Sequence, residues 1–271
     1  MAIRDAVTAY AGAVLTPAHR STIFAAMAHT LPRTPAAVVF DFDGTIADTM
    51  AVIIECYRAM YAALGDPCPT DREISATIGV PLETAIRMQS GYADGMLSRA
   101  VDAYRDAMRR LDLSLVQSFD GMPGVIRACA AAGMPVAVAS SRSHQSLDPM
   151  LSALGLYETM AMVIDHTDAG HEKPHPAMLT LIAESLGVDA SLLVMVGDTT
   201  FDVEMGHAAG AMTIGVTWGS HERTSIERAN PTVIADSPPQ ILAALGLTPA
   251  ANPGAPPGRE QALRTRHVSD R

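Results

Sequence analysis

Short, continuous apolar runs alternate with amphipathic stretches through the central part of the chain. The runs carry many β-branched residues and no regular polar alternation, which is typical of strands that helices cover on both faces. They occupy residues 36–40, 134–139, 160–164, 192–196 and 211–216. Helical patterns, each followed by a glycine where a helix would end, occupy residues 125–132, 145–154, 176–186 and 203–209. This order predicts an α/β fold with an open, doubly wound, Rossmann-like parallel sheet.

Residues 48–115 break this rhythm, because they contain no convincing strand. Helical patterns at 50–64, 82–89 and 97–111 predict a helical cap inserted between the first two strands. Polar connections at 46–48 and 117–124 would act as hinges. We therefore expect a core of residues 35–47 and 117–247 and a cap of residues 48–116.

The two ends of the chain have a different character. Residues 1–34 end close to Pro32 and Pro35 and are interpreted as an N-terminal extension, with an organellar transit peptide as the less favoured alternative. Residues 248–271 are rich in proline and glycine, which is typical of a disordered tail.

Composition and charge exclude several classes of function. Apolar residues make up 48% of the chain and charged residues 18%, which is enough for a folded core. A net charge of -10 without a basic cluster argues against nucleic-acid binding. No apolar run reaches the roughly 18 residues of a membrane span. Three cysteines without a C-x-x-C spacing are typical of reduced thiols, so we expect a cytoplasmic protein.

The strongest chemical signal is an apolar strand that runs into Asp41, Phe42, Asp43, Gly44 and Thr45. Residues i and i+2 of an extended strand point the same way, so both carboxylates can face one pocket. Two close carboxylates repel each other, which raises one pKa or attracts a cation. A plain polar turn is the alternative interpretation of the same residues.

Three further motifs make the turn interpretation less favourable. One strand ends at Ser140 and Ser141, and another runs into Gly197, Asp198, Thr199, Thr200, Phe201 and Asp202, while Lys173 stands in a loop before a proline-started helix. Ligands of open parallel sheets bind outside the carboxyl ends of the strands. Four aspartates would therefore meet in one crevice, where Lys173 and a divalent cation must balance their charge. Oxygen-only ligands favour Mg²⁺.

Together these motifs resemble the haloacid dehalogenase superfamily, in its phosphatase branch. The resemblance covers roughly residues 36–246, with all four signature motifs in family order, and the predicted insertion resembles the family's small helical cap. The stretch from His171 to Ala211 is most similar to phosphoglycolate phosphatase-like and pyrophosphatase-like members.

The resemblance implies a role for each catalytic residue. Asp41 would be the nucleophile that attacks phosphorus. Asp43 would protonate the leaving oxygen and then activate water against the aspartyl phosphate. Lys173 would neutralise charge on Asp41 and on the transferred group.

The resemblance also implies the metal ligands and the phosphate contacts. Mg²⁺ would be held by Asp41, by the backbone carbonyl of Asp43 and by Asp198, with Asp202 in support. The phosphoryl group would be bound by Ser140, Ser141, Lys173, Gly44 and Thr45. A small phosphorylated metabolite is the expected partner.

The substrate itself stays open at this point. A phosphoglycolate-like ester is the leading expectation, with pyrophosphate or a sugar or nucleotide phosphate as alternatives. A signalling module that keeps its phosphoryl group, and a catalytically idle relative, are less favoured. The sequence does not determine the oligomeric state or the cap residues that set specificity.

Overall fold

The computed structural model describes residues 31–247 and contains the predicted parallel sheet. The proposed tail and nearly all of the proposed N-terminal extension lie outside the described residues. Six strands pair in the order β5-β4-β1-β6-β7-β8, and all pairs are parallel. The strands are β1 (Ala37–Phe40), β4 (Val136–Ser140), β5 (Met162–Asp165), β6 (Leu193–Gly197), β7 (Met212–Val216) and β8 (Val233–Ala235). The fold class predicted from the sequence is therefore confirmed.

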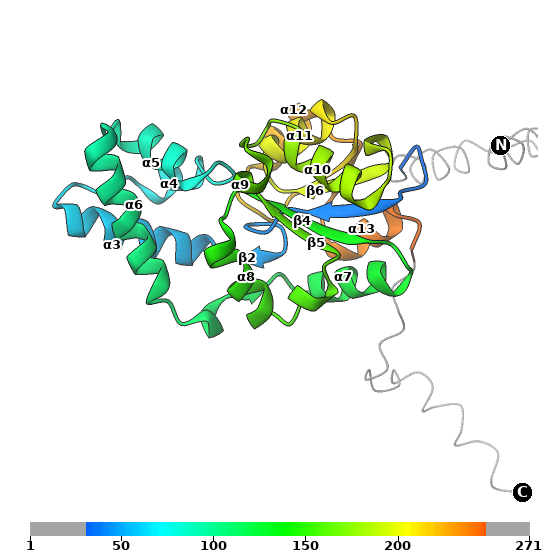
Figure 1. Cartoon of the computed structure of the whole chain (residues 1–271), viewed down its shortest axis with the longest axis horizontal. Helices are drawn as coiled ribbons and strands as arrows, with labels where there is room; N and C mark the ends of the chain where they lie inside the picture. Colours follow the sequence, from blue (N-terminus) through cyan, green and yellow to red (C-terminus); the bar gives the residue numbers. More distant parts are fainter. Residues whose placement is uncertain (1–30, 248–271) are drawn as a thin grey trace, which may run out of the picture.

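Alternate residues of the strands feed two separate cores, one on each face of the sheet. Val38 and Phe40 belong to the larger core, whereas Ala37 and Val39 belong to the smaller one, because successive side chains of a strand point to opposite faces. Figure 1 shows helices on both sides of the sheet. They are α7 (Met122–Ala131), α8 (His144–Ala153), α9 (His166–Ala169), α10 (Ala177–Leu186), α11 (Thr200–Ala208), α12 (Arg223–Ala229) and α13 (Pro238–Ala244), with short 3₁₀ turns η2 (Tyr157–Thr159) and η3 (Ala190–Leu192).

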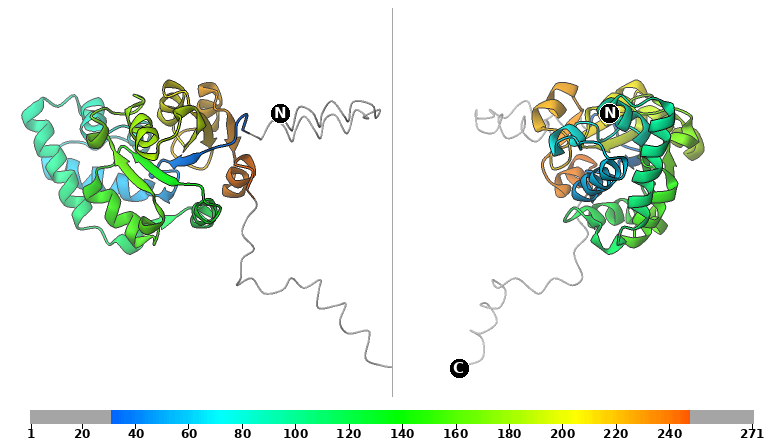
Figure 2. Two further views of the ribbon diagram at one scale, coloured as in Figure 1. Left: turned by 45° about the vertical axis from the view of Figure 1, so that its right-hand side comes forward. Right: turned by 90° about the vertical axis from the view of Figure 1, so that its left-hand side faces the viewer.

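A group of helices lies between β1 and β4 in the sequence and beyond one end of the sheet in space (Figures 1 and 2). It consists of α3 (Met50–Leu64), α4 (Asp71–Ser75), α5 (Leu82–Ser90), α6 (Asp94–Arg109) and the 3₁₀ turn η1 (Leu113–Leu115). Helix α6 packs against α3 and α5. Helix α4, which the periodicity did not predict, begins with a capping box between Thr70 and Glu73. We refer to α3–α6 as the cap helices.

The two connections to the cap helices pair with each other. Strands β2 (Ala47–Asp48) and β3 (Gln117–Ser118) form an antiparallel two-stranded ladder within the two segments expected as hinges, and the hydrophobic pattern did not predict these strands. Two-residue strands carry no detectable periodicity. Strand β8 was also missed, because it is only three residues long. Within residues 31–247, no helix combines the length and the apolar character needed to cross a membrane.

Candidate active site

The predicted acidic and hydroxyl residues lie at the carboxyl ends of three neighbouring strands. Asp41 follows β1 directly, and its backbone N–H donates to the carbonyl of Val196 on β6 at 2.9 Å. Ser140 ends β4 on one side of β1, and Asp198 follows β6 on the other. Since β1 lies between β4 and β6, their ends meet at the point where the strand order reverses.

Lys173 joins two of the aspartates. Its Nζ lies 2.7 Å from Oδ1 of Asp41 and 2.7 Å from Oδ1 of Asp202, and its side chain is fully buried. The other oxygen of Asp202 accepts hydrogen bonds from the backbone N–H and the hydroxyl of Thr199. Both oxygens of Asp202 are thus occupied by protein donors, which suits a supporting residue. Within the described residues, Lys173 is the one hydrogen-bond donor to the carboxylate of Asp41, which leaves Oδ2 free.

Asp198 is held by donors from two distant segments. Its Oδ1 accepts from the hydroxyl of Thr45 at 2.8 Å, and its Oδ2 accepts from the backbone N–H of Ser220 at 2.6 Å. Two glycines make room for this carboxylate. A Cβ on Gly44, whose φ is +81°, or on Gly219 would lie 2.2 Å from Oδ2 of Asp198. The close approach therefore requires glycine at both positions.

Asp43 is paired with an arginine that sequence reasoning did not single out. Arg142 donates from Nε to Oδ2 of Asp43 at 2.9 Å and from Nη2 to Oδ1 at 2.6 Å. The hydroxyl of Thr49 donates to Oδ1 at 2.6 Å. Burial alone would lower the pKa of the Arg142 guanidinium, but the carboxylate of Asp43 raises the pKa overall, so this arginine is charged.

The charges of this region do not balance without a cation. Four carboxylates face two cationic side chains, which leaves two negative charges in excess; they are Asp41, Asp43, Asp198 and Asp202 against Lys173 and Arg142. Oxygens of Asp41, Asp198 and Asp202 lie within 4.8 Å of one another and are buried. A divalent cation with oxygen ligands would neutralise this excess. The donor set therefore fits Mg²⁺.

The acidities of the buried groups reflect the same imbalance. Burial raises the pKa of Asp41 above its ordinary value, in opposition to the ammonium of Lys173, and the neighbouring carboxylates raise it further. Burial, together with Asp202, raises the pKa of Asp198 to about 6. Burial alone would lower the pKa of Lys173, but Asp202 and Asp41 raise it, so the ammonium is charged. Negative charge is in excess here, and a bound cation would lower the pKa of each carboxylate.

Comparison with known proteins identifies the family. The family model for haloacid dehalogenase-like hydrolases matches residues 38–216, which include most of the sheet, the cap helices, the four aspartates, Lys173 and Arg142. The chain belongs to this family. The resemblance noted from the motifs is thereby confirmed.

Several curated relatives of this hydrolase carry phosphatase names. A probable phosphatase, IndB, of Dickeya dadantii is 36% identical over 212 residues, which cover 76% of this chain and 92% of that protein. A phosphoglycolate phosphatase of Shigella boydii is 31% identical, covering 79% and 94%. A crystal structure of a predicted phosphoglycolate phosphatase from Haemophilus somnus has a TM-score of 0.72 at 19% identity, covering 78% of this chain and 98% of that one. At 19% identity, the similarity to this crystal structure shows a shared fold.

The loop of this hydrolase that carries Ser140, Ser141 and Arg142 is fixed at both ends. The backbone N–H of Arg142 donates to the hydroxyl of Ser140 at 3.1 Å. The hydroxyl of Ser141, predicted to bind phosphate, donates to the carbonyl of Gly79 in the segment between α4 and α5, at 2.6 Å. Ser141 therefore ties the core to the cap segment.

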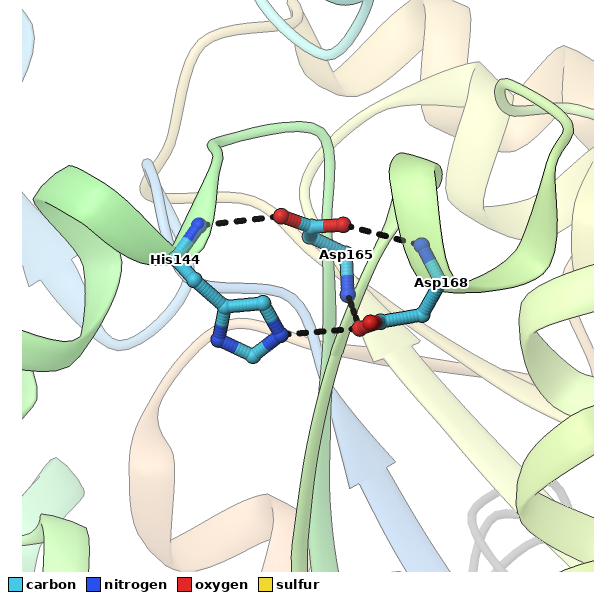
Figure 3. A group of neighbouring side chains, drawn as sticks. All are labelled: His144, Asp165 and Asp168. Carbon is cyan, nitrogen blue, oxygen red and sulfur yellow. Dashed lines mark hydrogen bonds and ion pairs between the residues drawn. The ribbon is translucent and has the colours of Figure 1, made fainter.

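Figure 3 shows the anchor on the other side of the same loop. The backbone N–H of His144, the first residue of α8, donates to Oδ2 of Asp165 at 2.9 Å. The His144 ring contacts Asp168 at 2.8 Å and Asp148 at 2.9 Å. Burial would lower the pKa of His144, but its hydrogen bonds to these two carboxylates raise it to about 9. The ring is thus a charged bridge between α8 and α9. Although His144, Asp165 and Asp168 are close enough for a metal, both ring nitrogens already have carboxylate partners.

A cavity opens between the core residues of the hydrolase and its cap helices. Its volume is about 340 Å³, and it reaches from Asp41 and Asp43 along the β4–α8 loop to His166 after β5. The cap side contributes Tyr57 and Arg105, among other residues.

Sequence reasoning missed Arg142, Thr49 and Ser220. Arg142 stands two residues after Ser140, but a lone arginine in a loop is usually a solvated charge. Ser220 acts through its backbone, which no side-chain pattern can reveal. For Lys173 a stronger signal was available: it is the only lysine among the 19 Lys and Arg residues of the chain. A lysine retained in an arginine-based composition points to a site that needs a compact ammonium.

Proposed function

We propose that this hydrolase is a Mg²⁺-dependent phosphatase that cleaves a small phosphomonoester through an aspartyl-phosphate intermediate. The observation that carries the proposal is the setting of Asp41. Its carboxylate is buried, faces the cavity and is held by Lys173 through one oxygen, while the other accepts no hydrogen bond from residues 31–247. A carboxylate fixed in this way is suited to nucleophilic attack.

In the first step, the free oxygen of Asp41 attacks phosphorus and the bond between phosphorus and the leaving oxygen breaks. Asp43, in its protonated form, donates its proton to that oxygen and is left ionised. In the second step, Asp43 takes a proton from water, the water oxygen attacks phosphorus, and Asp41 is released with inorganic phosphate. Lys173 stays charged throughout and offsets negative charge on Asp41 and the phosphoryl group.

Asp41, Asp198 and the backbone carbonyl of Asp43 would hold Mg²⁺, and Asp202 would support the site through Lys173. When bound, the ion would neutralise charge on the phosphoryl oxygens and favour the ionised form of the carboxylates. Asp198 is kept in place for this task by the hydroxyl of Thr45, the backbone of Ser220 and the space that Gly44 leaves.

We propose a small metabolite as the substrate. A cavity of about 340 Å³ lies at the lower end of the range for ligand pockets, roughly 300–1,000 Å³, and suits a phosphoryl group with a short leaving group. A phosphoglycolate-like ester is our leading candidate, because several relatives bear that name. Pyrophosphate, or a sugar or nucleotide phosphate, is the alternative. We also propose a cytoplasmic location, since Cys56, Cys68 and Cys129 are free thiols.

The test is the substitution Asp41→Asn with p-nitrophenyl phosphate and Mg²⁺. Loss of the nucleophile should lower kcat more than about 1,000-fold, and a chelator should do the same to the wild type. Asp48→Asn, which neutralises an exposed carboxylate on β2, is the matched control and should keep its activity. Near wild-type turnover by Asp41→Asn would refute the proposal. Stoichiometric phosphorylation of the wild type without turnover would favour the signalling module instead.

A further inference from the structure

The guanidinium of Arg142 is buried between the site and the cap helices. Its side chain is only 7% exposed, and its carboxylate partner is Asp43. Nη1 of Arg142 lies 3.8 Å from the sulfur of Met108 on α6. The charge is therefore covered by the cap on one side and reaches the proposed acid on the other.

The bonds of Asp43 must change during the reaction. Oδ1 accepts from Thr49 and Arg142, and Oδ2 accepts from Arg142. A proton on Oδ2 occupies one of the two positions at which this oxygen accepts hydrogen bonds, so its transfer to a leaving oxygen weakens the contact with Nε of Arg142. A buried guanidinium that loses its partner is unfavourable, because water does not replace the lost hydrogen bonds. A second anion beside Asp43 would take over those bonds.

The space beside Arg142 is the same cavity. Arg142 and His166 both line it. Among residues 31–247, Nδ1 of His166 is the one buried side-chain nitrogen or oxygen without a hydrogen-bond partner. An apolar leaving group would offer no hydrogen-bond acceptor to the guanidinium of Arg142.

The other arginines of the cavity are poorer candidates for anion recognition. Arg105 pairs with Glu83 at 2.8 Å and is 41% exposed, and Arg109 pairs with Asp106 and is 54% exposed. Both are already neutralised by carboxylates of the cap helices, in contact with water. Solvent weakens the interaction of such exposed charges with an anion, so they distinguish an anionic from a neutral substrate less well.

We propose that Arg142 is a specificity-determining residue that binds an anionic group, a carboxylate or a second phosphate, on the leaving group of the substrate. The inference rests on the proposed phosphatase function and deepens it. The anion accepts the hydrogen bonds that Asp43 gives up, so a substrate with this group frees the acid at the moment of binding.

The experiment compares three small esters. Of these, 2-phosphoglycolate and phosphoglycolamide differ only in a carboxylate against a neutral amide. The third, ethylene glycol bisphosphate, carries a second phosphate and one more methylene group. A hydrogen-bonded buried charge pair corresponds to about 10- to 100-fold in kcat/KM, so the wild type should prefer an anionic ester by that factor. The better of the two anionic esters identifies the group.

Substitutions then assign the preference to Arg142. In Arg142→Met the preference for an anionic ester should fall below about 3-fold. Arg142→Lys keeps the charge but loses the bidentate geometry, so it should retain only part of the preference. Arg58→Met, a surface arginine of α3 paired with Glu55 and Asp71, is the matched control and should keep the full preference. Arg105→Met tests whether Arg105 provides the preference for an anionic ester instead of Arg142.

Three results would overturn the inference. The first is a kcat/KM of the wild type for phosphoglycolamide within about 3-fold of its values for both anionic esters. The second is an equal loss of kcat/KM for all esters in Arg142→Met, which is the result for a residue that only positions Asp43. The third is loss of the preference in Arg105→Met but not in Arg142→Met. Should Arg142→Met fail to fold by circular dichroism, an unchanged preference in Arg142→Lys overturns the inference. Calorimetric binding of the esters to Asp41→Asn, with and without Arg142→Lys, measures the preference without turnover. The role of Arg142 can thus be refuted while the phosphatase activity is confirmed. Equally, the binding preference can be confirmed while the phosphatase activity is refuted.

Discussion

Replacing Lys173 with methionine tests the electrostatic core of the site. Lys173 has no exposed side-chain surface, and its partners Asp41 and Asp202 are only 4% and 1% exposed. Methionine keeps most of the volume but leaves two buried carboxylates without their cation. Removing one partner of a buried ion pair costs about 3–5 kcal/mol. That is a large part of the roughly 5–15 kcal/mol that stabilises a typical domain.

The loss should depend on pH in a defined direction. Without Lys173, burial holds the folded-state pKa of Asp41 even further above its unfolded value than in the wild type. A carboxylate with a raised folded pKa binds a proton more tightly in the folded state, so the protein is destabilised most when that proton is absent. The destabilisation is therefore greatest at pH 8 and shrinks as the pH falls toward 5.

The assay is urea denaturation of the wild type and Lys173→Met at pH 5 and pH 8, with a chelator present. A linear extrapolation gives the free energy of unfolding for each. The double variant Lys173→Met, Asp202→Asn removes one of the stranded charges and should recover part of the loss. A loss below about 1 kcal/mol that is the same at both pH values would refute the reasoning, because it would mean that the pairs with Asp41 and Asp202 contribute nothing.

Two further predictions concern the supports of the site. Gly219→Ala places a Cβ 2.2 Å from Oδ2 of Asp198 and should lower the apparent affinity for Mg²⁺ at least about 10-fold. The affinity is measured from the dependence of turnover on the Mg²⁺ concentration. The control Gly95→Ala has no atom within 4 Å of its new Cβ and should leave the affinity unchanged. His144→Gln removes a charged bridge whose pKa is raised to about 9. A raised histidine pKa stabilises the fold fully below about pH 6.5 and no longer does so above pH 9. Because the ring is 37% exposed, we expect a difference in unfolding free energy of only about 1 kcal/mol between wild type and variant at pH 6, vanishing near pH 10, in the same urea assay. A difference that grows with pH would contradict this assignment.

The sequence by itself determined the fold class and the family. The five apolar runs became β1, β4, β5, β6 and β7, because a strand buried on both faces must be continuously apolar. The helical pattern at 50–64 matches α3 residue for residue. The motifs around Asp41 and Asp198 carried the family resemblance, since strand ends with paired acids have few other uses. The roles of those residues stay predictions.

Tertiary structure alone decided which residue pairs with Asp43. Arg142 contacts Asp43 across 99 positions of the chain, whereas the contact of Lys173 with Asp41, across 132 positions, was expected only from the family resemblance. No local pattern encodes such pairs, because they depend on the order of the strands and on the direction in which each loop leaves the sheet. The pairing of β2 with β3 and the backbone donor of Ser220 were hidden for the same reason. Local periodicity records which face of an element is buried, whereas the partner of a buried charge is set only when distant elements pack together.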